Sequence, residues 1–206
     1  MFELDDRRVL RRYVDSRLNA TAEAALMTYA HGHGYPAPAV ESADGTDIVM
    51  ERISGATMLD LLLVGGLEPL IAGSMLATLL TRLHAIPPRP GCPPGDRLLH
   101  LDLHPGNVMM GSHGPVVIDW CNARNGPPDL DIAVSALILG EVIAGGHPAA
   151  AGARDMLAEL LAVAGGHPGD RLAEAVRMRA ADPYLEPEEV ERLDRAASLV
   201  RASVPQ

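Results

Sequence analysis

The stretch His100-Leu101-Asp102-Leu103-His104-Pro105-Gly106-Asn107 decides the fold of this 206-residue chain. Two short apolar runs joined by a Gly-Ser-His-Gly turn follow it, and this pattern predicts a β-hairpin over residues 107–118. Asp119 stands where the second predicted strand ends. Because the two strands of a hairpin lie side by side, we expect it to bring Asp102, Asn107 and Asp119 into one small volume.

These three side chains suit phosphoryl transfer. One carboxylate can orient an attacking hydroxyl and accept its proton, while an amide oxygen and a second carboxylate hold Mg²⁺ against nucleotide phosphates. Asn107 follows Asp102 by five residues, which is the spacing of the H-R-D-x-x-x-x-N catalytic loop of protein kinases. We therefore interpret Asp102 as the catalytic base and Asn107 and Asp119 as Mg²⁺ ligands.

The segment resembles the catalytic loop of the aminoglycoside phosphotransferase and choline kinase-like family, whose members are relatives of protein kinases. In that family the loop reads H-x-D-x-x-x-x-N and the metal-binding aspartate follows in I-D-W or I-D-F, to which Val117-Ile118-Asp119-Trp120 is similar. The run Gly126–Ala133 is similar to the family's G-D-P-x-x-D-L-A stretch and puts Asp131 at its aspartate. The resemblance implies that His100 and Asp131 support the catalytic loop.

The resemblance extends upstream to a nucleotide site. Val9-Leu10-Arg11-Arg12-Tyr13 resembles the strand that carries the family's ATP-binding lysine, and Glu23 takes the place of the glutamate that pairs with it. An arginine stands where lysine is expected; it keeps the positive charge and can clamp phosphate with two nitrogens. We favour Arg11 over Arg12 for this role because Arg11 shares a strand face with Val9.

The stretch Met50-Glu51-Arg52-Ile53-Ser54-Gly55 resembles the family's segment between the two lobes. It implies that the backbone at Glu51 and Ile53 hydrogen-bonds adenine, and Met50 suits the lining of an adenine pocket because methionine fills irregular apolar space. The implied cofactors are ATP or GTP together with Mg²⁺. The resemblance covers roughly residues 8–135, including an L-H-x-x-P stretch at Leu83–Pro87.

The order of predicted elements gives an α+β chain with two lobes, and the resemblance implies a protein kinase-like fold. We expect a reduced N-terminal nucleotide-binding lobe over residues 1–52, built from a strand, a helix and a hairpin, and a mostly helical C-terminal lobe over residues 53–206. Only seven residues precede the first predicted strand, and no G-x-G-x-x-G motif occurs. The N-lobe is therefore expected to lack the strands of the Gly-rich loop, so that nucleotide is held less firmly and water is excluded less well. Predicted helices cover residues 57–64, 67–86, 130–145, 149–164, 168–181 and 187–202.

Composition narrows the partners and the compartment. Lys plus Arg is 17 against Asp plus Glu 27, a formal net charge of −10, which argues against a nucleic-acid or anionic-membrane binder and suits a cationic ligand. The two cysteines form no C-x-x-C pair. The low-charge stretch 132–153 is broken by Gly145-Gly146-His147-Pro148, which predicts two buried helices rather than a membrane span. We expect a cytoplasmic protein.

These observations favour an ATP-dependent phosphotransferase that acts on a hydroxyl of a small molecule. The main alternative is a catalytically impaired, pseudokinase-like nucleotide-binding module that acts through a protein partner, which would also cover the nucleotide site. A kinase of protein substrates is a third hypothesis. The acidic run at 186–191 either favours the start of a helix or forms a wall for a polycationic acceptor.

Two further interpretations of the central stretch are open. His100, Asp102 and His104 form H-x-D-x-H, which is also found in metal-hydrolase sites with imidazole ligands, and His84 and His113 are candidates for the remaining ligands. The stretch can also be purely structural, with its polar side chains satisfying turns.

Overall fold

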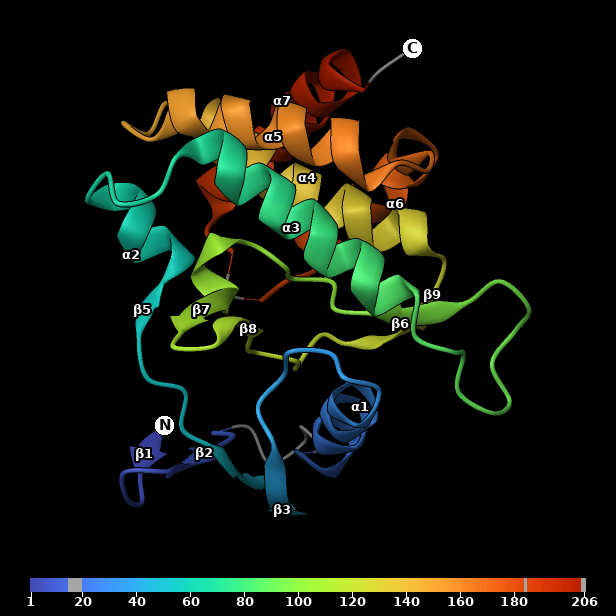
Figure 1. The fold of residues 1–206 in the computed structure, drawn as a ribbon. Helices are drawn as coiled ribbons and strands as arrows, with labels where there is room; N and C mark the ends of the chain where they lie inside the picture. The colour runs from blue at the N-terminus through green and yellow to red at the C-terminus, as the bar shows by residue number, and fades with distance from the viewer. Residues whose placement is uncertain (15–19, 184, 205–206) are drawn as a thin grey trace.

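A computed structural model describes residues 1–14, 20–183 and 185–204, and it shows an α+β fold with a small lobe below a larger helical one (Figure 1). The small lobe is an antiparallel sheet of order β1-β2-β4-β3 that packs against helix α1 (Ala20–Gly32). The predicted strand, helix and hairpin are confirmed, whereas the short edge strand β1 is new. The strands are β1 (Phe2–Glu3), β2 (Arg8–Arg12), β3 (Val40–Asp44) and β4 (Asp47–Glu51).

The hairpin of β3 and β4 turns through Gly45, whose φ of 54° lies in the left-handed region that a two-residue hairpin turn requires. Ile48 and Met50 alternate along β4 and are buried, and Val9 pairs with Met50 across the sheet. They share one hydrophobic core with Met27 of α1. The period-two pattern of the strands thus gives the sheet one apolar face, which the helix covers.

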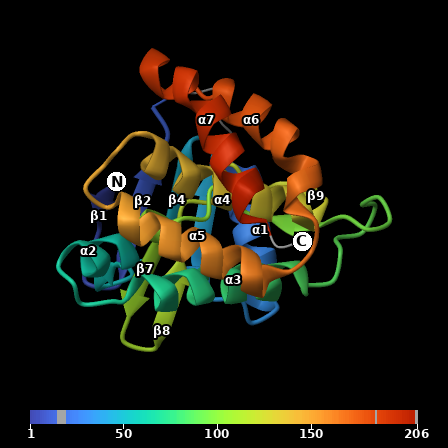
Figure 2. The ribbon, with the colours of Figure 1, turned by 90° about the horizontal axis from the view of Figure 1, so that it is seen from above.

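The large lobe is built around α4 (Pro128–Ala144), which is buried along most of its length. Helix α3 (Pro69–His84) packs against α5 (Ala150–Ala164), and the two lie side by side in Figure 2. Gly73 allows this close approach, since a Cβ there would lie 2.6 Å from the carbonyl oxygen of Met156. The other helices are α2 (Met58–Leu63), α6 (Leu172–Ala180) and α7 (Pro187–Ser203), with short 3₁₀ turns η1 (Pro105–Asn107) and η2 (Pro168–Arg171).

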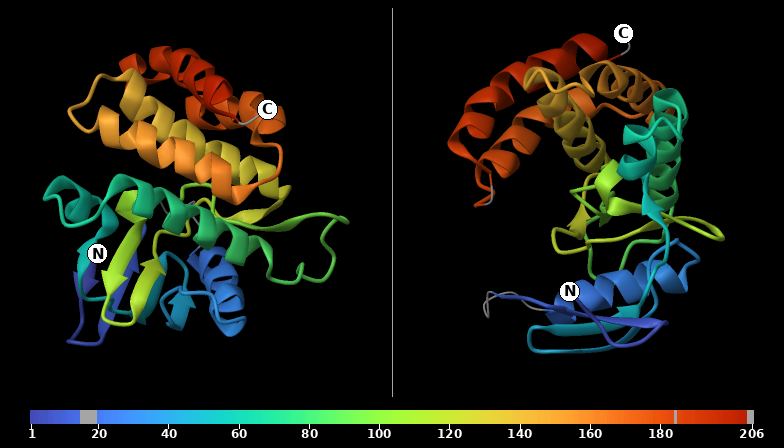
Figure 3. Two further views of the ribbon diagram at one scale, coloured as in Figure 1. Left: turned by 45° about the horizontal axis from the view of Figure 1, so that its top comes forward. Right: turned by 90° about the vertical axis from the view of Figure 1, so that its left-hand side faces the viewer.

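Two small sheets lie where the lobes face each other (Figure 3). The predicted hairpin is confirmed as β7 (Val108–Gly111) and β8 (Gly114–Val117), and β5 (Ala56–Thr57) joins it. Strand β6 (Arg97–Leu99) pairs with β9 (Arg124–Gly126), and neither was predicted. The stretch predicted to be catalytic therefore leaves β6 and enters β7, and the chain returns along β8 and continues to β9.

None of the helices in the described ranges has the length and apolar character needed to cross a bilayer. The boundary between the lobes at residue 52 stays a prediction.

Candidate functional site

The loop after β6 is held by a buried carboxylate. Asp131, at the start of α4, is fully buried and accepts hydrogen bonds from the backbone N–H groups of His100 (3.0 Å) and Leu101 (2.7 Å). Leu101 has a φ of 63°, a left-handed conformation that is costly for a side chain of this kind. The two hydrogen bonds stabilise that conformation and thereby fix the direction in which the next residue, Asp102, leaves the loop.

Asp131 also pairs with His84 of α3, whose Nε2 lies 2.9 Å from its carboxylate. Burial alone would raise the pKa of Asp131, but the hydrogen bond and charge of His84 and the two backbone donors outweigh it and lower the pKa. Asp131 therefore stays ionised in the interior, as expected of a residue that braces the loop without touching substrate.

His100 also lies in the interior, and its ring is fully buried. Its Nε2 lies 3.1 Å from the carbonyl oxygen of Ile118, and the ring packs edge-on against Trp120. Burial lowers the pKa of His100, so the ring is neutral. Within the described ranges, no group of three or more His, Cys, Asp or Glu could hold a metal ion. The metal-hydrolase alternative therefore gains no set of ligands from the described residues.

Asp102 and Asn107 are in direct contact. The Asn107 amide nitrogen donates to the backbone oxygen of Asp102 (2.9 Å) and to its carboxylate (3.1 Å). The short turn η1 carries Asn107 to this position, with the His104 ring accepting the Gly106 N–H. Both donating bonds use the amide nitrogen, so the amide oxygen of Asn107 is left as a ligand atom.

The carboxylate of Asp102 has a shifted proton affinity. Burial raises its pKa to about 6, against the opposing effect of the Arg179 guanidinium and the Asn107 hydrogen bond. A base with a pKa just below neutrality is ionised at neutral pH yet keeps a useful proton affinity. His104 lies at the 4.0 Å limit of an ion pair with Asp102, and burial lowers its own pKa to about 4.

Asp119 follows β8 with a φ of 63° and accepts a 2.7 Å hydrogen bond from Arg11. Burial alone would raise the pKa of Asp119, but the Arg11 guanidinium and hydrogen bonds from Cys121 and Arg11 hold it below its usual value. Burial beside this carboxylate raises the pKa of Cys121 to about 12, so Cys121 remains a neutral thiol. Asp119 thus presents an ionised carboxylate.

The other nitrogen of Arg11 donates to Glu23 of α1 at 3.0 Å, which confirms the expected pairing. The buried Glu23 carboxylate also accepts the Tyr13 hydroxyl and the backbone N–H of Trp120, at 3.2 Å. Burial raises the pKa of Glu23, although Tyr13 and Arg11 act in the opposite direction. These contacts fix the arginine head group beside Asp119.

A cavity of about 730 Å³ opens beside Arg11, between the sheet of the small lobe and the hairpin β7–β8. All five residues predicted for the nucleotide site line it: Arg11, Glu23, Met50, Glu51 and Ile53. Its apolar walls include Val9, Met27, Met109 and Ile118. An apolar slot with a cation at its inner end suits a nucleotide base and its phosphates.

In the segment between the lobes, part of the backbone is free to form hydrogen bonds with a nucleotide base. The N–H of Glu51 already donates to the Ala39 carbonyl at 2.8 Å, so a nucleotide contact there falls to the Glu51 carbonyl oxygen. The N–H of Ile53 makes no hydrogen bond to the described residues. For the two backbone contacts expected with adenine, the Ile53 N–H is therefore available as a donor and the Glu51 carbonyl oxygen as an acceptor.

A second cavity, also about 730 Å³, contains Asp102. Arg11, Tyr13 and Asp119 line both cavities, so the two meet at the Arg11–Asp119 contact. One side can take a nucleotide and the other a second molecule that faces Asp102. This is the arrangement that a group-transfer reaction between two substrates needs.

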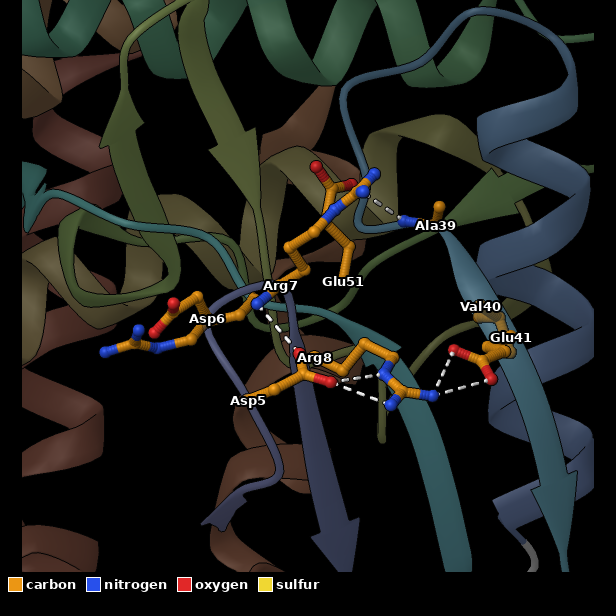
Figure 4. Close-up of a pocket in the computed structure, with 9 residues that line it drawn as sticks. Asp5, Asp6, Arg7, Arg8, Ala39, Val40, Glu41 and Glu51 are labelled. Carbon is orange, nitrogen blue, oxygen red and sulfur yellow. Dashed lines mark hydrogen bonds and ion pairs between the residues drawn. The ribbon is translucent and has the colours of Figure 1, made fainter.

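A third cavity, about 790 Å³, lies on the small lobe away from these groups (Figure 4). Its charges largely neutralise one another, since Arg8 pairs with Asp5 at 2.7 Å and with Glu41 at 3.1 Å. Glu51 lines it as well as the nucleotide cavity, but Asp102, Asn107 and Asp119 do not.

The sequence analysis missed five titratable side chains that line the second cavity: Tyr13, Cys121, Arg124, Arg179 and Asp182. Tyr13 and Cys121 each stand two residues from a predicted site residue, and that proximity was an available signal. Arg124 and Arg179 had none, because they reach the cavity only through the pairing of β9 and the packing of α6 against α4.

Comparison with known proteins finds similarity in a segment of the sequence and in the fold. A model of the Phosphotransferase enzyme family matches residues 93–169, which include the catalytic loop and α4. No curated protein matches the sequence.

Among solved structures, aminoglycoside phosphotransferase APH(2'')-Ib with bound ADP has a TM-score of 0.58 at 13% identity, over 98% of this chain and 89% of that one. The streptomycin–ATP ternary complex of APH(2'')-IIa has a TM-score of 0.60 at 13% identity, over 97% and 86%. A choline/ethanolamine kinase family protein from Mesorhizobium loti has 0.54 at 15%, over 96% and 82%. The chain has the kinase-like fold of these proteins, as expected. Over residues 93–169 the chain is also similar to the Phosphotransferase enzyme family.

Proposed function

We propose that the protein transfers the γ-phosphate of ATP or GTP to a hydroxyl group of a small molecule. The observation that carries the proposal is the meeting of two cavities at Arg11 and Asp119, with Asp102 facing the second one. A nucleotide occupies the cavity beneath the sheet, and the acceptor occupies the other. The acceptor hydroxyl then lies near the carboxylate that takes its proton.

The residues present fit a Mg²⁺ ion. Asn107 offers an amide oxygen, and Asp119 offers a carboxylate whose pKa lies below its usual value. Mg²⁺ commonly binds through one or two protein oxygens together with substrate phosphates, so a larger protein cluster is not needed. When bound, the ion neutralises the charge that develops on the phosphates.

The chain's own residues have separate tasks. Asp102 orients the acceptor hydroxyl and accepts its proton, and the Asn107 amide keeps this carboxylate in place. Arg11 offers its guanidinium to the nucleotide phosphates while Glu23 holds it from behind. His100 and Asp131 keep the backbone of the loop in the conformation that aims Asp102 at the second cavity.

Calorimetry with ATP in the presence and absence of Mg²⁺ tests the nucleotide site. A coupled assay for ADP release, over a panel of neutral, cationic and anionic hydroxyl compounds, tests the transfer. Asp102→Asn should abolish transfer, and Asp194→Asn on the exposed side of α7 is the matched control. Tight Mg-ATP binding without transfer to any compound would favour the nucleotide-binding module that acts through a protein partner.

A further inference from the structure

The charges that line the second cavity indicate which kind of acceptor it can bind. The inference drawn from them rests on the proposed function. Its charged lining consists of three arginines and three aspartates: Arg11, Arg124, Arg179, Asp102, Asp119 and Asp182. Most of these charges are already engaged with a partner of the opposite sign. The groups left over indicate what kind of molecule the cavity can accept.

Arg11 and Asp119 neutralise each other at 2.7 Å, and Glu23 adds a second negative partner. Arg179 is held by both carboxylate oxygens of Glu141, at 3.0 and 2.9 Å, and also contacts Asp182 at 3.4 Å. Neither arginine offers an unmatched charge to an acceptor. Among the described lining residues, Asp102 and Arg124 remain without an ion pair of N···O below 4.0 Å.

Arg124 is exposed at the start of β9, and its guanidinium contacts only the neutral sulfur of Met178, at 3.0 Å. Its backbone pairs with Leu99, the last residue of β6, and the chain reaches Asp102 three residues later. The β6–β9 pairing thus holds an unpaired cation close to the proposed base, in the same cavity. Leu101, Val134 and Pro183 supply apolar lining between the charged groups.

The acidic run that suits a polycationic acceptor lies elsewhere. Glu186, Glu188, Glu189 and Glu191 do not line this cavity, and Glu186 with Glu189 forms a capping box at the start of α7. The acids that do line it are committed either to Arg11 and Arg179 or to the proposed chemistry. A cationic substrate would therefore meet one unpaired cation, and among the described lining residues the one carboxylate without an ion pair below 4.0 Å is Asp102, the proposed base.

We propose that the acceptor carries an anionic group, a carboxylate or a phosphate, in addition to its hydroxyl, and that Arg124 binds this group. A guanidinium presents two parallel N–H donors that match either anion. With the anion at Arg124, the hydroxyl at the other end of a compact molecule faces Asp102. Arg124 would then be a specificity-determining residue for the acceptor, with no part in nucleotide binding.

A series with one carbon skeleton tests this: D-glycerate, glycerol 3-phosphate, neutral glycerol and cationic serinol, with gentamicin as a polycation. Each is titrated into the protein saturated with Mg²⁺ and AMP-PNP, and each is assayed as an acceptor with ATP. We expect an anionic member to bind more tightly than glycerol, serinol and gentamicin. Comparing the affinities of D-glycerate and glycerol 3-phosphate shows whether the cavity prefers a carboxylate or a phosphate.

Arg124→Gln should weaken binding of the preferred anion by about 10- to 100-fold, the loss expected for charge-assisted hydrogen bonds. It should leave glycerol and Mg-ATP binding unchanged, and Arg124→Lys should restore part of the affinity. Arg195→Gln, an exposed arginine of α7 outside the cavity, is the control. Tighter binding of serinol or gentamicin, an Arg124→Gln variant that binds the anion normally, or no anion binding at millimolar concentration overturns the inference.

The two proposals fail separately. Asp102-dependent transfer to gentamicin or serinol would refute the anionic acceptor and support the phosphotransferase. Binding of the anion without any Asp102-dependent transfer would support the role of Arg124 and count against the proposed function.

Discussion

A guanidinium nitrogen of Arg11 lies 2.7 Å from a carboxylate oxygen of Asp119, 108 positions away in the chain. Arg11 stands on β2 of the small lobe, and Asp119 follows β8 of the large one. The contact therefore joins the two lobes at the point where the two cavities meet. A nucleotide phosphate placed there would share Arg11 with Asp119.

Arg11→Ala should weaken Mg-ATP binding by about 10-fold or more, because a charge-assisted contact to the phosphates is lost. It should also lower the free energy of unfolding by roughly 3 kcal/mol, since the Glu23 side chain, only 4% exposed, loses its cation. Calorimetry and urea unfolding measure the two effects.

The double variant Arg11→Ala/Glu23→Gln separates the effect on nucleotide binding from the effect on stability. It should regain part of the lost stability, because the uncompensated buried charge is removed, without regaining nucleotide affinity. Nucleotide affinity equal to wild type in the single variant would contradict the role given to Arg11.

The rate of transfer should depend on the ionisation of Asp102. Burial raises the pKa of this carboxyl to about 6, so kcat/KM should rise with pH and level off above that value, because only the ionised form accepts the hydroxyl proton. The measurement is a pH profile of kcat/KM for the acceptor.

A titrating nucleotide phosphate could produce a similar profile, and Arg179→Gln distinguishes the two. The Arg179 guanidinium opposes the effect of burial on Asp102, so its removal should raise the pKa of Asp102 and move the profile to higher pH. A profile that does not move would show that Asp102 is not the titrating group.

Asp131→Asn should destabilise the protein by about 2 kcal/mol or more, because a buried acceptor of three hydrogen bonds loses its charge. The pKa of Asp131 is lowered by folding, so its stabilisation is present above the usual carboxyl pKa and is lost as pH falls through the lowered value. The difference in free energy of unfolding between Asp131→Asn and wild type, measured in urea, should therefore become smaller in acid. Asp155→Asn, on the exposed side of α5, should show neither effect.

The packing of α3 on α5 sets a steric limit at Gly73. An added Cβ would lie 2.6 Å from a backbone oxygen of α5, so Gly73→Ala should cost about 1–3 kcal/mol. Gly32→Ala at the end of α1 meets no atom within 4 Å and serves as the control. Equal thermal stability of the two variants would contradict this account of the helix contact.

The local elements could be predicted because each carries its own pattern. The 3.6-residue apolar period of α3, the alternation along β4 and the turn between β7 and β8 are all visible in short windows of sequence. The pairing of β6 with β9 was not predicted, since three-residue strands distant in sequence have no periodicity of their own.

The same reason explains which site residues were found. Asp102, Asn107 and Asp119 flank one hairpin closely in sequence, so their spacing carries the prediction. Arg124 and Arg179 enter the acceptor cavity through tertiary packing alone. The acidic net charge pointed to a cationic ligand, but charge summed over a chain says little about a cavity in which most charges are paired.

The most direct test of the account is phosphate transfer by Asp102→Asn, measured beside its binding of Mg-ATP. We predict that transfer falls by at least 100-fold while the Kd for Mg-ATP and the unfolding midpoint stay close to wild type, because the carboxylate acts on the acceptor and not on the nucleotide. Transfer at the wild-type rate in this variant would contradict the assignment of Asp102 as the base, and with it the proposed mechanism.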